Sequence, residues 1–339
     1  MALAAAALLL CAPAAPLAAP PAYKQVTAFR PTYPPNASAV TGVSACAVGT
    51  GSDQSVYVGQ RGKGAPPILV LDSTGKLLRS FGQDADIGTM HGMHMQQLGG
   101  GKQALWITDS HNSKVHKFDP ATGKLLVTLG THGTALHPLQ FGSVADIAFD
   151  AEGNLYISDG DGGVDARIMK LDPSHKLLWA VGNNGTVSPP ASAFASPHSL
   201  DYDASTHRVW VADRNHNRLR AFEAATGAEV PGAYTAVFSS PGCTKPAVWS
   251  VRVDPASSQL FVANSNFGSG SACPAVAATA HEGRVAIIPL PKAGPLTGEP
   301  AILPLAGCVL TPLTLHFRAG DGHRGLCAAG TRLPPRDLR

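Results

Sequence analysis

A segment of about 50 residues recurs along the chain, and this repeat constrains the fold more than any other feature of the sequence. Three copies contain the related strings LWITDS, LYISDG and VWVADR, whose aspartates Asp109, Asp159 and Asp213 are 50 and 54 residues apart. Two more divergent copies begin at Val56 and Leu260. Repeats of this length are typical of propellers and solenoids, in which each unit packs only against its neighbours.

Each copy has the same internal pattern. A short run of alternating apolar residues predicts a strand, a polar Asp/Asn/Gly corner follows, and a second alternating run such as residues 167–171 predicts another strand. A turn of the D-P-x-x-G-K type leads to a third strand, and a further short strand precedes each copy. Four antiparallel strands of this kind form a propeller blade. We therefore predict an all-β propeller, because one blade cannot bury both of its faces alone.

We expect six blades in a single domain that covers residues 24–339, because these 316 residues divided by about 50 give six units. The expected blades cover residues 40–83, 90–132, 144–184, 197–234, 247–291 and 301–339. The last blade is expected to be degenerate or incomplete. Residues 312–315 suit an inner strand, but the segment GHRGLCAAGTRLPPRDLR lacks the alternating apolar residues of the other copies.

The N-terminal residues 1–19 read MALAAAALLLCAPAAPLAA, an apolar run followed by small residues. This pattern predicts a signal peptide and a secreted or secretory-pathway protein, although a disordered alanine-rich leader without a basic residue is the alternative. No later apolar run approaches 18 residues, so no membrane span is expected. Five cysteines follow the leader, and Cys243 and Cys273 are close enough in sequence to pair across a loop, while the odd count leaves at least one thiol free.

The composition excludes some classes of function. Charged residues make up 14% of the chain, the net charge is +3, and lysine and arginine are not clustered, so a nucleic-acid partner is not expected. The 36 glycines and 28 prolines favour many turns and exclude a fold of long helices. We expect a monomer.

The repeats follow the wording G-x-L-Y-V-x-D and N-x-R-I-x-x-F-D, which resembles the NHL repeat. More specific strings are M-H-G-M at residues 90–93, Y-I-S-D-G at 156–160, S-P-H-S-L at 196–200 and V-A-D-R-N at 211–215. With these strings the chain resembles the peptidyl-α-hydroxyglycine α-amidating lyases, over roughly residues 40–230. The resemblance implies a lyase that cleaves a peptide with a C-terminal α-hydroxyglycine into a peptide amide and glyoxylate.

Two histidines stand out from the thirteen in the chain. His91 and His198 each stand at the start of an expected innermost strand, and such strand starts converge on the axis of a propeller. Side chains from different blades could therefore hold one metal ion there. The resemblance implies that this ion is zinc, bound by histidines from three blades.

The third zinc ligand of the family pattern has no clear counterpart. The family has P-H-D at the inner strand of the last blade, where this chain has Pro312, Leu313 and Thr314. His316 is on the opposite side of an alternating strand from Leu313, so it is a poor substitute.

The resemblance also implies a calcium ion near the axis, held by backbone carbonyl groups and by the aspartate of the same P-H-D string. Val43 and Met93 match the carbonyl positions, but Thr314 replaces the aspartate. Calcium prefers carboxylate oxygens, so this site is expected to be weak or empty.

Three further residues have roles implied by the resemblance. Arg61 would bind the carboxylate of the substrate, and Arg214 would polarise its hydroxyl group; a guanidinium suits both roles because it stays charged and binds planar oxygens. Asp161 occupies the position of the tyrosine that serves as the base, unless an insertion has shifted this loop. Without the resemblance, both arginines would be interpreted as corner residues paired with nearby aspartates. The alternative function is therefore a non-catalytic secreted propeller that binds a peptide, a carbohydrate or a protein.

Overall fold

The structure is a computed structural model. It describes residues 43–49, 55–162, 164–183, 193–230, 247–255, 258–265, 284–290, 301–304, 315–317 and 326–328. Within these ranges the chain forms strands and turns, and the helical segments are two short 3-10 helices, η2 (Gln83–Ala85) and η3 (Arg214–His216). The prediction of an all-β fold is confirmed.

The strands form antiparallel sheets in which neighbours in sequence pair with each other. The first sheet consists of β1 (Ala45–Val48), β2 (Val56–Gly59), β3 (Ile68–Leu71) and β4 (Leu77–Phe81). The second consists of β5 (Met90–Gln97), β6 (Gln103–Asp109), β7 (Lys114–Phe118) and β8 (Leu125–Leu129). The third consists of β9 (Val144–Phe149), β10 (Leu155–Asp159), β11 (Ala166–Leu171) and β12 (Leu177–Asn183). The next two are β13 (Pro197–Asp203), β14 (Arg208–Asp213) and β15 (Arg218–Glu223), and then β16 (Ala247–Asp254), β17 (Gln259–Ser265), β18 (Arg284–Pro289) and β19 (Ala301–Pro304).

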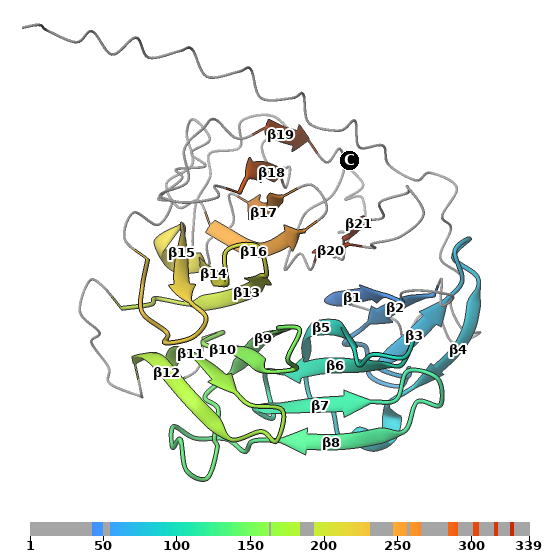
Figure 1. Ribbon diagram of the computed structural model, residues 1–339. Helices are drawn as coiled ribbons and strands as arrows, with labels where there is room; N and C mark the ends of the chain where they lie inside the picture. Colours follow the sequence, from blue (N-terminus) through green and yellow to red (C-terminus); the bar gives the residue numbers. More distant parts are fainter. Residues whose placement is uncertain are drawn as a thin grey trace, which may run out of the picture.

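These five sheets are the blades of a propeller. The first strand of each blade lies innermost, and β1, β5, β9, β13 and β16 follow one another around a common centre (Figure 1). The last strands, including β4, β8 and β12, lie at the periphery (Figure 1). A two-stranded sheet of β20 (Leu315–Phe317) and β21 (Leu326–Ala328) lies beside β1, and β20 also contacts β16.

The expected count of six blades is wrong for the part of the chain that the structure describes, which forms five blades and this two-stranded sheet. One reason is the place of β19, which was expected in the sixth blade over residues 301–339. β19 extends the ladder of β18, with Ile287 opposite Ala301, and so completes the fifth blade. The loop between β18 and β19 has 11 residues, against five between β3 and β4, and this longer loop hides the repeat pattern.

The three recurring aspartates hold the second, third and fourth blades to the segments that enter them. Each lies at the end of a second strand and accepts backbone N–H groups from the residues just before the innermost strand of the same blade. Asp109 binds the N–H groups of Gly88 and Thr89, and Asp159 binds those of Gly142 and Ser143. Asp213 binds those of residues 195 and 196 in the same way. The repeat string therefore has a structural cause, since these buried N–H groups need acceptors.

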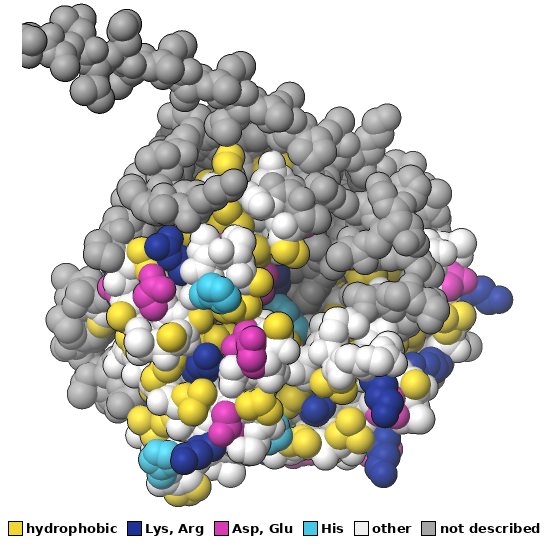
Figure 2. All heavy atoms as spheres, in the orientation of Figure 1, with side chains coloured by type: hydrophobic (Ala, Val, Ile, Leu, Met, Phe, Trp, Pro, Cys, Tyr) yellow, Lys and Arg dark blue, Asp and Glu magenta, His cyan; other side chains and the backbone are white. Residues whose placement is uncertain are grey.

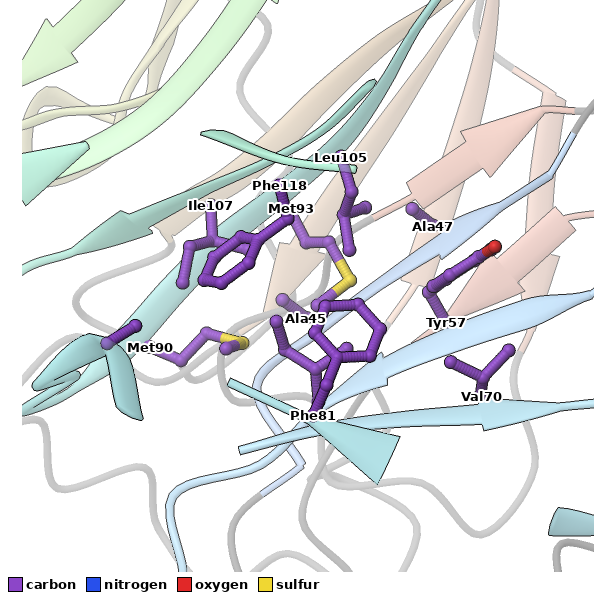
Figure 3. Packing of buried hydrophobic residues seen from close by; sticks show 12 residues of the cluster. Ala45, Ala47, Tyr57, Val70, Phe81, Met90, Met93, Leu105, Ile107 and Phe118 are labelled. Atoms are coloured by element: carbon purple, nitrogen blue, oxygen red, sulfur yellow. The ribbon is translucent and has the colours of Figure 1, made fainter. Parts of the chain in front are cut away.

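Apolar side chains fill the space between neighbouring blades. Figure 3 shows this packing between the first two blades, where Phe81 and Phe118 meet with ring centroids 5.6 Å apart. Met90 and Met93 from β5 pack into the same cluster as Ala45 from β1. The cores thus lie between blades, as expected for units that cannot bury their faces alone.

One extra residue interrupts the innermost strand of each of the second to fifth blades. In β5 it lies between Met90 and Met93, at His91 and Gly92, and in β9 it is Ala145. In β13 and β16 it occupies the positions of residues 198 and 249. Such β-bulges bend a strand and redirect a side chain, and they are common beside active sites.

A buried polar network ties four innermost strands together just beyond these bulges. The Arg252 guanidinium on β16 lies 2.9 Å from the Asp146 carboxylate on β9. The same carboxylate accepts a hydrogen bond from Ser199 on β13 (2.7 Å) and lies 2.8 Å from Nε2 of His94 on β5. Burial raises the pKa of Asp146, but Arg252 and His94 outweigh this and hold it well below its ordinary value. The carboxylate is therefore ionised and paired inside the fold.

Figure 2 shows Lys and Arg side chains interspersed with Asp and Glu over the described part of one face. In the described ranges, no helix has the length and apolar character needed to cross a membrane.

We predict that Arg252→Met destabilises the fold by about 3–5 kcal/mol, because it leaves Asp146 buried without its cation. Urea unfolding followed by tryptophan fluorescence measures this change. The matched control is Lys114→Met, whose partner Asp86 is exposed and whose loss should cost no more than about 1 kcal/mol. Equal midpoints for the two variants would show that the network does not support the ring.

Candidate functional site

The two histidines singled out in the sequence lie side by side near the centre of the propeller. His91 is on β5 and His198 is on β13, both at the bulges described above. Their ring centroids are 4.7 Å apart and the planes meet edge to face. Both side chains are buried, with 5% and 3% of their surface exposed. The two histidines therefore converge from the second and fourth blades, as the sequence predicted.

Each histidine is oriented by the bulge of the next blade. Nδ1 of His91 lies 2.8 Å from the carbonyl oxygen of Ala145, and Nδ1 of His198 lies 2.7 Å from that of Trp249. A carbonyl oxygen only accepts, so each Nδ1 carries the proton. In a neutral imidazole the Nε2 atom then carries a lone pair, and this atom can bind a metal ion.

The close approach of the second and third blades requires a glycine at position 92. A Cβ atom at Gly92 would lie 2.8 Å from Asp146 Oδ1 and 2.9 Å from the carbonyl oxygen of Ala145. The backbone N–H of Gly92 donates instead to the Thr108 hydroxyl, which in turn donates to the same carbonyl oxygen. A larger residue at this bulge would therefore push apart the strands that position His91.

Asp161 completes the cluster from the turn after β10. Its backbone N–H donates to the Ser143 carbonyl oxygen, and its own carbonyl oxygen accepts from the Ser143 hydroxyl, which fixes the turn. Oδ2 of Asp161 lies 3.0 Å from Nε2 of His91, and Oδ1 lies 3.7 Å from Nε2 of His198. One donor atom from each of the three residues lies within 4.8 Å of the others.

The charges in the cluster are strongly perturbed. Burial raises the pKa of Asp161, but His91, His198 and Arg214 outweigh it and lower that pKa far below its ordinary range, so the carboxylate is ionised. Burial, with the nearby charges of His91 and Arg214, lowers the pKa of His198 to about 3. His198 is therefore neutral at physiological pH, and its Nε2 atom carries a lone pair that accepts no hydrogen bond from a described residue.

Arg214 lies against the other side of the carboxylate. It stands on η3 directly after β14, and its Nη1 donates to Asp161 Oδ1 at 2.8 Å. Its guanidinium lies over the Trp249 ring, 4.9 Å from the centroid. The same tryptophan packs edge to face on His198 at 5.1 Å. Trp249 thus holds an arginine and a histidine of the cluster in place.

Arg61 borders the cluster from the first blade. Its Nε donates to the carbonyl oxygen of Met90, the residue before His91, at 2.8 Å, while part of the side chain is exposed. Partial desolvation lowers the pKa of Arg61, and attraction to Asp161 acts in the opposite direction. The structure therefore brings both predicted arginines, both histidines and Asp161 to one place.

The donor set suits a transition-metal ion such as zinc. Two imidazole nitrogens and one carboxylate oxygen are common zinc ligands, and each histidine has the backbone partner that typically orients such ligands. Nε2 of His198 is buried and has no hydrogen-bond partner among the described residues. Among the described residues, one group of three potential metal ligands lies close enough to share an ion, and it consists of His91, Asp161 and His198.

Zinc and calcium at this centre both stay predictions. Leu313 and Thr314 lie outside the described residues, and His316 lies on β20. For the calcium site, the Met93 side chain packs in the core between the first two blades and Val43 packs beside the first blade. These positions say nothing about ligation by their carbonyl groups, so the calcium site stays a prediction.

Two parts of the site were missed in the sequence. Ala145 acts through its backbone carbonyl group, which leaves no signature in a residue type. Trp249 could have been found by aligning the inner strands, because A-D-I at 145–147, H-S-L at 198–200 and W-S-V at 249–251 share one register. Chemically, the assembled site can bind a metal ion, and it presents two guanidinium groups to an anionic ligand.

Comparisons with known proteins support the repeat and the resemblance. The family model of the NHL repeat matches residues 194–222. NHL repeat-containing protein 3 of Mus musculus is 38% identical over 241 residues, which are 69% of this chain and 65% of that protein. A probable peptidyl-α-hydroxyglycine α-amidating lyase of Caenorhabditis elegans is 30% identical over 159 residues, which are 46% of this chain and 43% of that one. The chain thus spans less than two thirds of each relative.

Hydrazine synthase of Kuenenia stuttgartiensis has a similar structure, with a TM-score of 0.53 over 86% of this chain and 72% of that chain. Its sequence identity of 12% supports similarity of fold alone. The repeat match and the lyase relatives agree with the strings found in the sequence and with the ring of blades. This chain is an NHL-repeat β-propeller that resembles the peptidyl-α-hydroxyglycine α-amidating lyases.

Proposed function

We propose that the protein is a lyase that cleaves peptidyl-α-hydroxyglycine into a peptide amide and glyoxylate. The observation that carries this proposal is the assembly of His91, His198, Arg61 and Arg214 around one point at the centre of the ring. Relatives with about 30% identity include an amidating lyase, and these four residues are those that the resemblance implied. The substrate would come from an enzyme that hydroxylates the terminal glycine.

The reaction splits the bond between the amide nitrogen and the hydroxylated carbon. The hydroxyl group loses its proton, its oxygen forms the carbonyl group of glyoxylate, and the electron pair of the C–N bond goes to the nitrogen, which takes up a proton. The reaction therefore consumes no net proton. It needs cationic groups for the carboxylate and for the developing negative charge on the hydroxyl oxygen.

The arginines supply these groups. Arg61 is exposed enough to meet an incoming peptide and would bind the carboxylate of its hydroxyglycine. Arg214 donates one Nη1 hydrogen bond to Asp161 and a weaker one from Nε to Asn215. Its Nη2 group donates to no described residue, so it can polarise the substrate hydroxyl. A zinc ion bound by His91 and His198 would supply a Lewis acid beside them.

Asp161 is poorly suited to the role of base. Its ion pairs lower the pKa of its carboxyl group, and a carboxylate with a lower pKa takes up a proton less readily. The residue nevertheless lies in direct contact with His91 and Arg214.

A second candidate function is a non-catalytic propeller that binds a peptide or another ligand at the same centre. It is favoured by the relative with 38% identity, which is named for its repeat and for no activity. It is also favoured by Asp161, which replaces the tyrosine of the lyase pattern.

We predict that Arg61→Ala and Arg214→Ala each lower the rate of glyoxylate release by about 10²–10³-fold, because developing negative charge loses a donor. An α-hydroxyhippurate-type substrate with zinc supplied serves for the assay. Lys63→Ala is the matched control, because Lys63 is an exposed cation two residues from Arg61. It should keep the wild-type rate.

Two results would count against the proposal in different ways. If the wild-type protein releases no glyoxylate, the lyase function is wrong and the binding function remains. If activity survives both arginine substitutions, the residue assignment is wrong even though the activity is right.

We further propose that the protein matures in the secretory pathway. The leader suggested by residues 1–19 lies outside the described residues, but Cys46 on β1 is disulfide-bonded, which fits an oxidising compartment. We predict that Cys46 of the natively expressed protein resists alkylation by a maleimide until a reductant is added. Peptide mass mapping would detect this, and a freely alkylated Cys46 in folded protein would contradict it.

A further inference from the structure

We propose that Asp161 is the third ligand of the metal centre, so that the ion is held by His91, His198 and one carboxylate rather than by three histidines. This inference builds on the proposed function, which supplies the reason to expect a metal ion. The proposal supplies a third ligand in place of the histidine of the P-H-D string, where this chain has Leu313. It also gives Asp161 a role that differs from that of a base.

A cation between His91 and Asp161 would stabilise their contact. Nδ1 of His91 donates to the Ala145 carbonyl oxygen, so a neutral ring presents an Nε2 lone pair to Asp161 Oδ2 at 3.0 Å. Two lone pairs at this distance repel each other unless a proton or a metal ion lies between or beside them. Two ligands of a tetrahedral zinc ion are about 3.3–3.6 Å apart, given metal–ligand distances of about 2.0–2.2 Å. The observed separation is slightly shorter than this range.

His198 supplies an independent reason. Its Nε2 atom is buried without a hydrogen-bond partner among the described residues, and it points into the same cluster, 3.7 Å from Asp161 Oδ1. A buried polar atom without a partner is costly and is rare in folded proteins. A metal ion would satisfy the atom without protonating it.

The two carboxylate oxygens of Asp161 have different partners. Oδ2 faces His91, and Oδ1 accepts from Arg214 Nη1 at 2.8 Å. This division matches a ligand whose second oxygen is held by a hydrogen-bond donor, as carboxylate ligands of metals commonly are. Arg214 is itself fixed over the Trp249 ring. Arg214 is therefore a positioning residue for Asp161 as well as a candidate donor to the substrate.

The ligand set selects the kind of ion. Two imidazoles and one carboxylate favour zinc, cobalt(II) or iron(II) over calcium, which prefers six or more oxygen ligands. Three protein ligands leave at least one coordination position open, as in catalytic rather than structural zinc sites. The carboxylate also offsets one of the two positive charges of the ion, which a third histidine would not do.

Cobalt(II) binding to the full-length protein tests this inference, because cobalt reports its ligands by visible absorption and replaces zinc in such sites. The variants are Asp161→Asn, which keeps the shape and removes the charge, and Asp161→Cys, which offers a thiolate instead. Glu152→Gln is the matched control, because Glu152 is an exposed carboxylate on the same blade. Competition with a chelator measures each affinity.

We expect wild-type protein and Glu152→Gln to bind one cobalt ion per chain with equal affinity. Asp161→Asn should bind it at least about 100-fold more weakly, because loss of even an outer partner of a ligand costs 10–100-fold. Asp161→Cys loaded with cobalt should show a sulfur-to-metal charge-transfer band that the wild-type protein lacks. This band would place residue 161 in direct contact with the ion, which a merely structural role would not produce.

Three outcomes would overturn the inference: no cobalt binding by the wild-type protein, wild-type affinity in Asp161→Asn, or no charge-transfer band in metal-loaded Asp161→Cys. If Asp161→Asn fails to fold by far-ultraviolet circular dichroism, the spectrum of Asp161→Cys decides. The result is separable from the proposed function. Binding through Asp161 without glyoxylate release would remove the lyase and leave the metal centre, whereas lyase activity with metal retained by Asp161→Asn would do the reverse.

Discussion

A β-bulge at one register position of the innermost strand in the second to fifth blades positions the candidate site. It turns His91 and His198 of the second and fourth blades toward each other, and it turns the carbonyl groups of Ala145 and Trp249 toward the histidine of the preceding blade. Alternate blades thus supply rings and carbonyl groups from the same structural position. A repeated fold obtains an asymmetric site in this way by changing only the residue at the bulge.

The buried network beyond the bulges keeps this arrangement in register. Asp146 and Ala145 are neighbours on β9, and Arg252 follows Trp249 by three residues on β16, so the ion pair joins the two strands whose carbonyl groups orient the histidines. Ser199, next to His198, donates to the same carboxylate. Buried ion pairs contribute little net stability compared with apolar packing, but breaking one is costly. The network therefore resists any shift of one inner strand against another.

The sequence predicted much of this from its repeat. Alternation, turn strings and the aspartates Asp109, Asp159 and Asp213 identified the blades, and strand position alone identified the histidines. The fifth blade was cut short because an insertion separates β19 from β18. The contact of Asp161 with both histidines was not foreseen, since it depends on a turn held by Ser143, and backbone carbonyl groups cannot be recognised from residue types.

Anomalous diffraction from crystals grown with zinc would show whether His91, His198 and Asp161 hold a metal ion, because it locates the ion without reference to activity. We expect one peak at the centre of the ring, about 2.0–2.2 Å from Nε2 of His91, Nε2 of His198 and a carboxylate oxygen of Asp161. Crystals with no zinc peak at these three residues, and with a direct hydrogen bond between His91 and Asp161 instead, would contradict it.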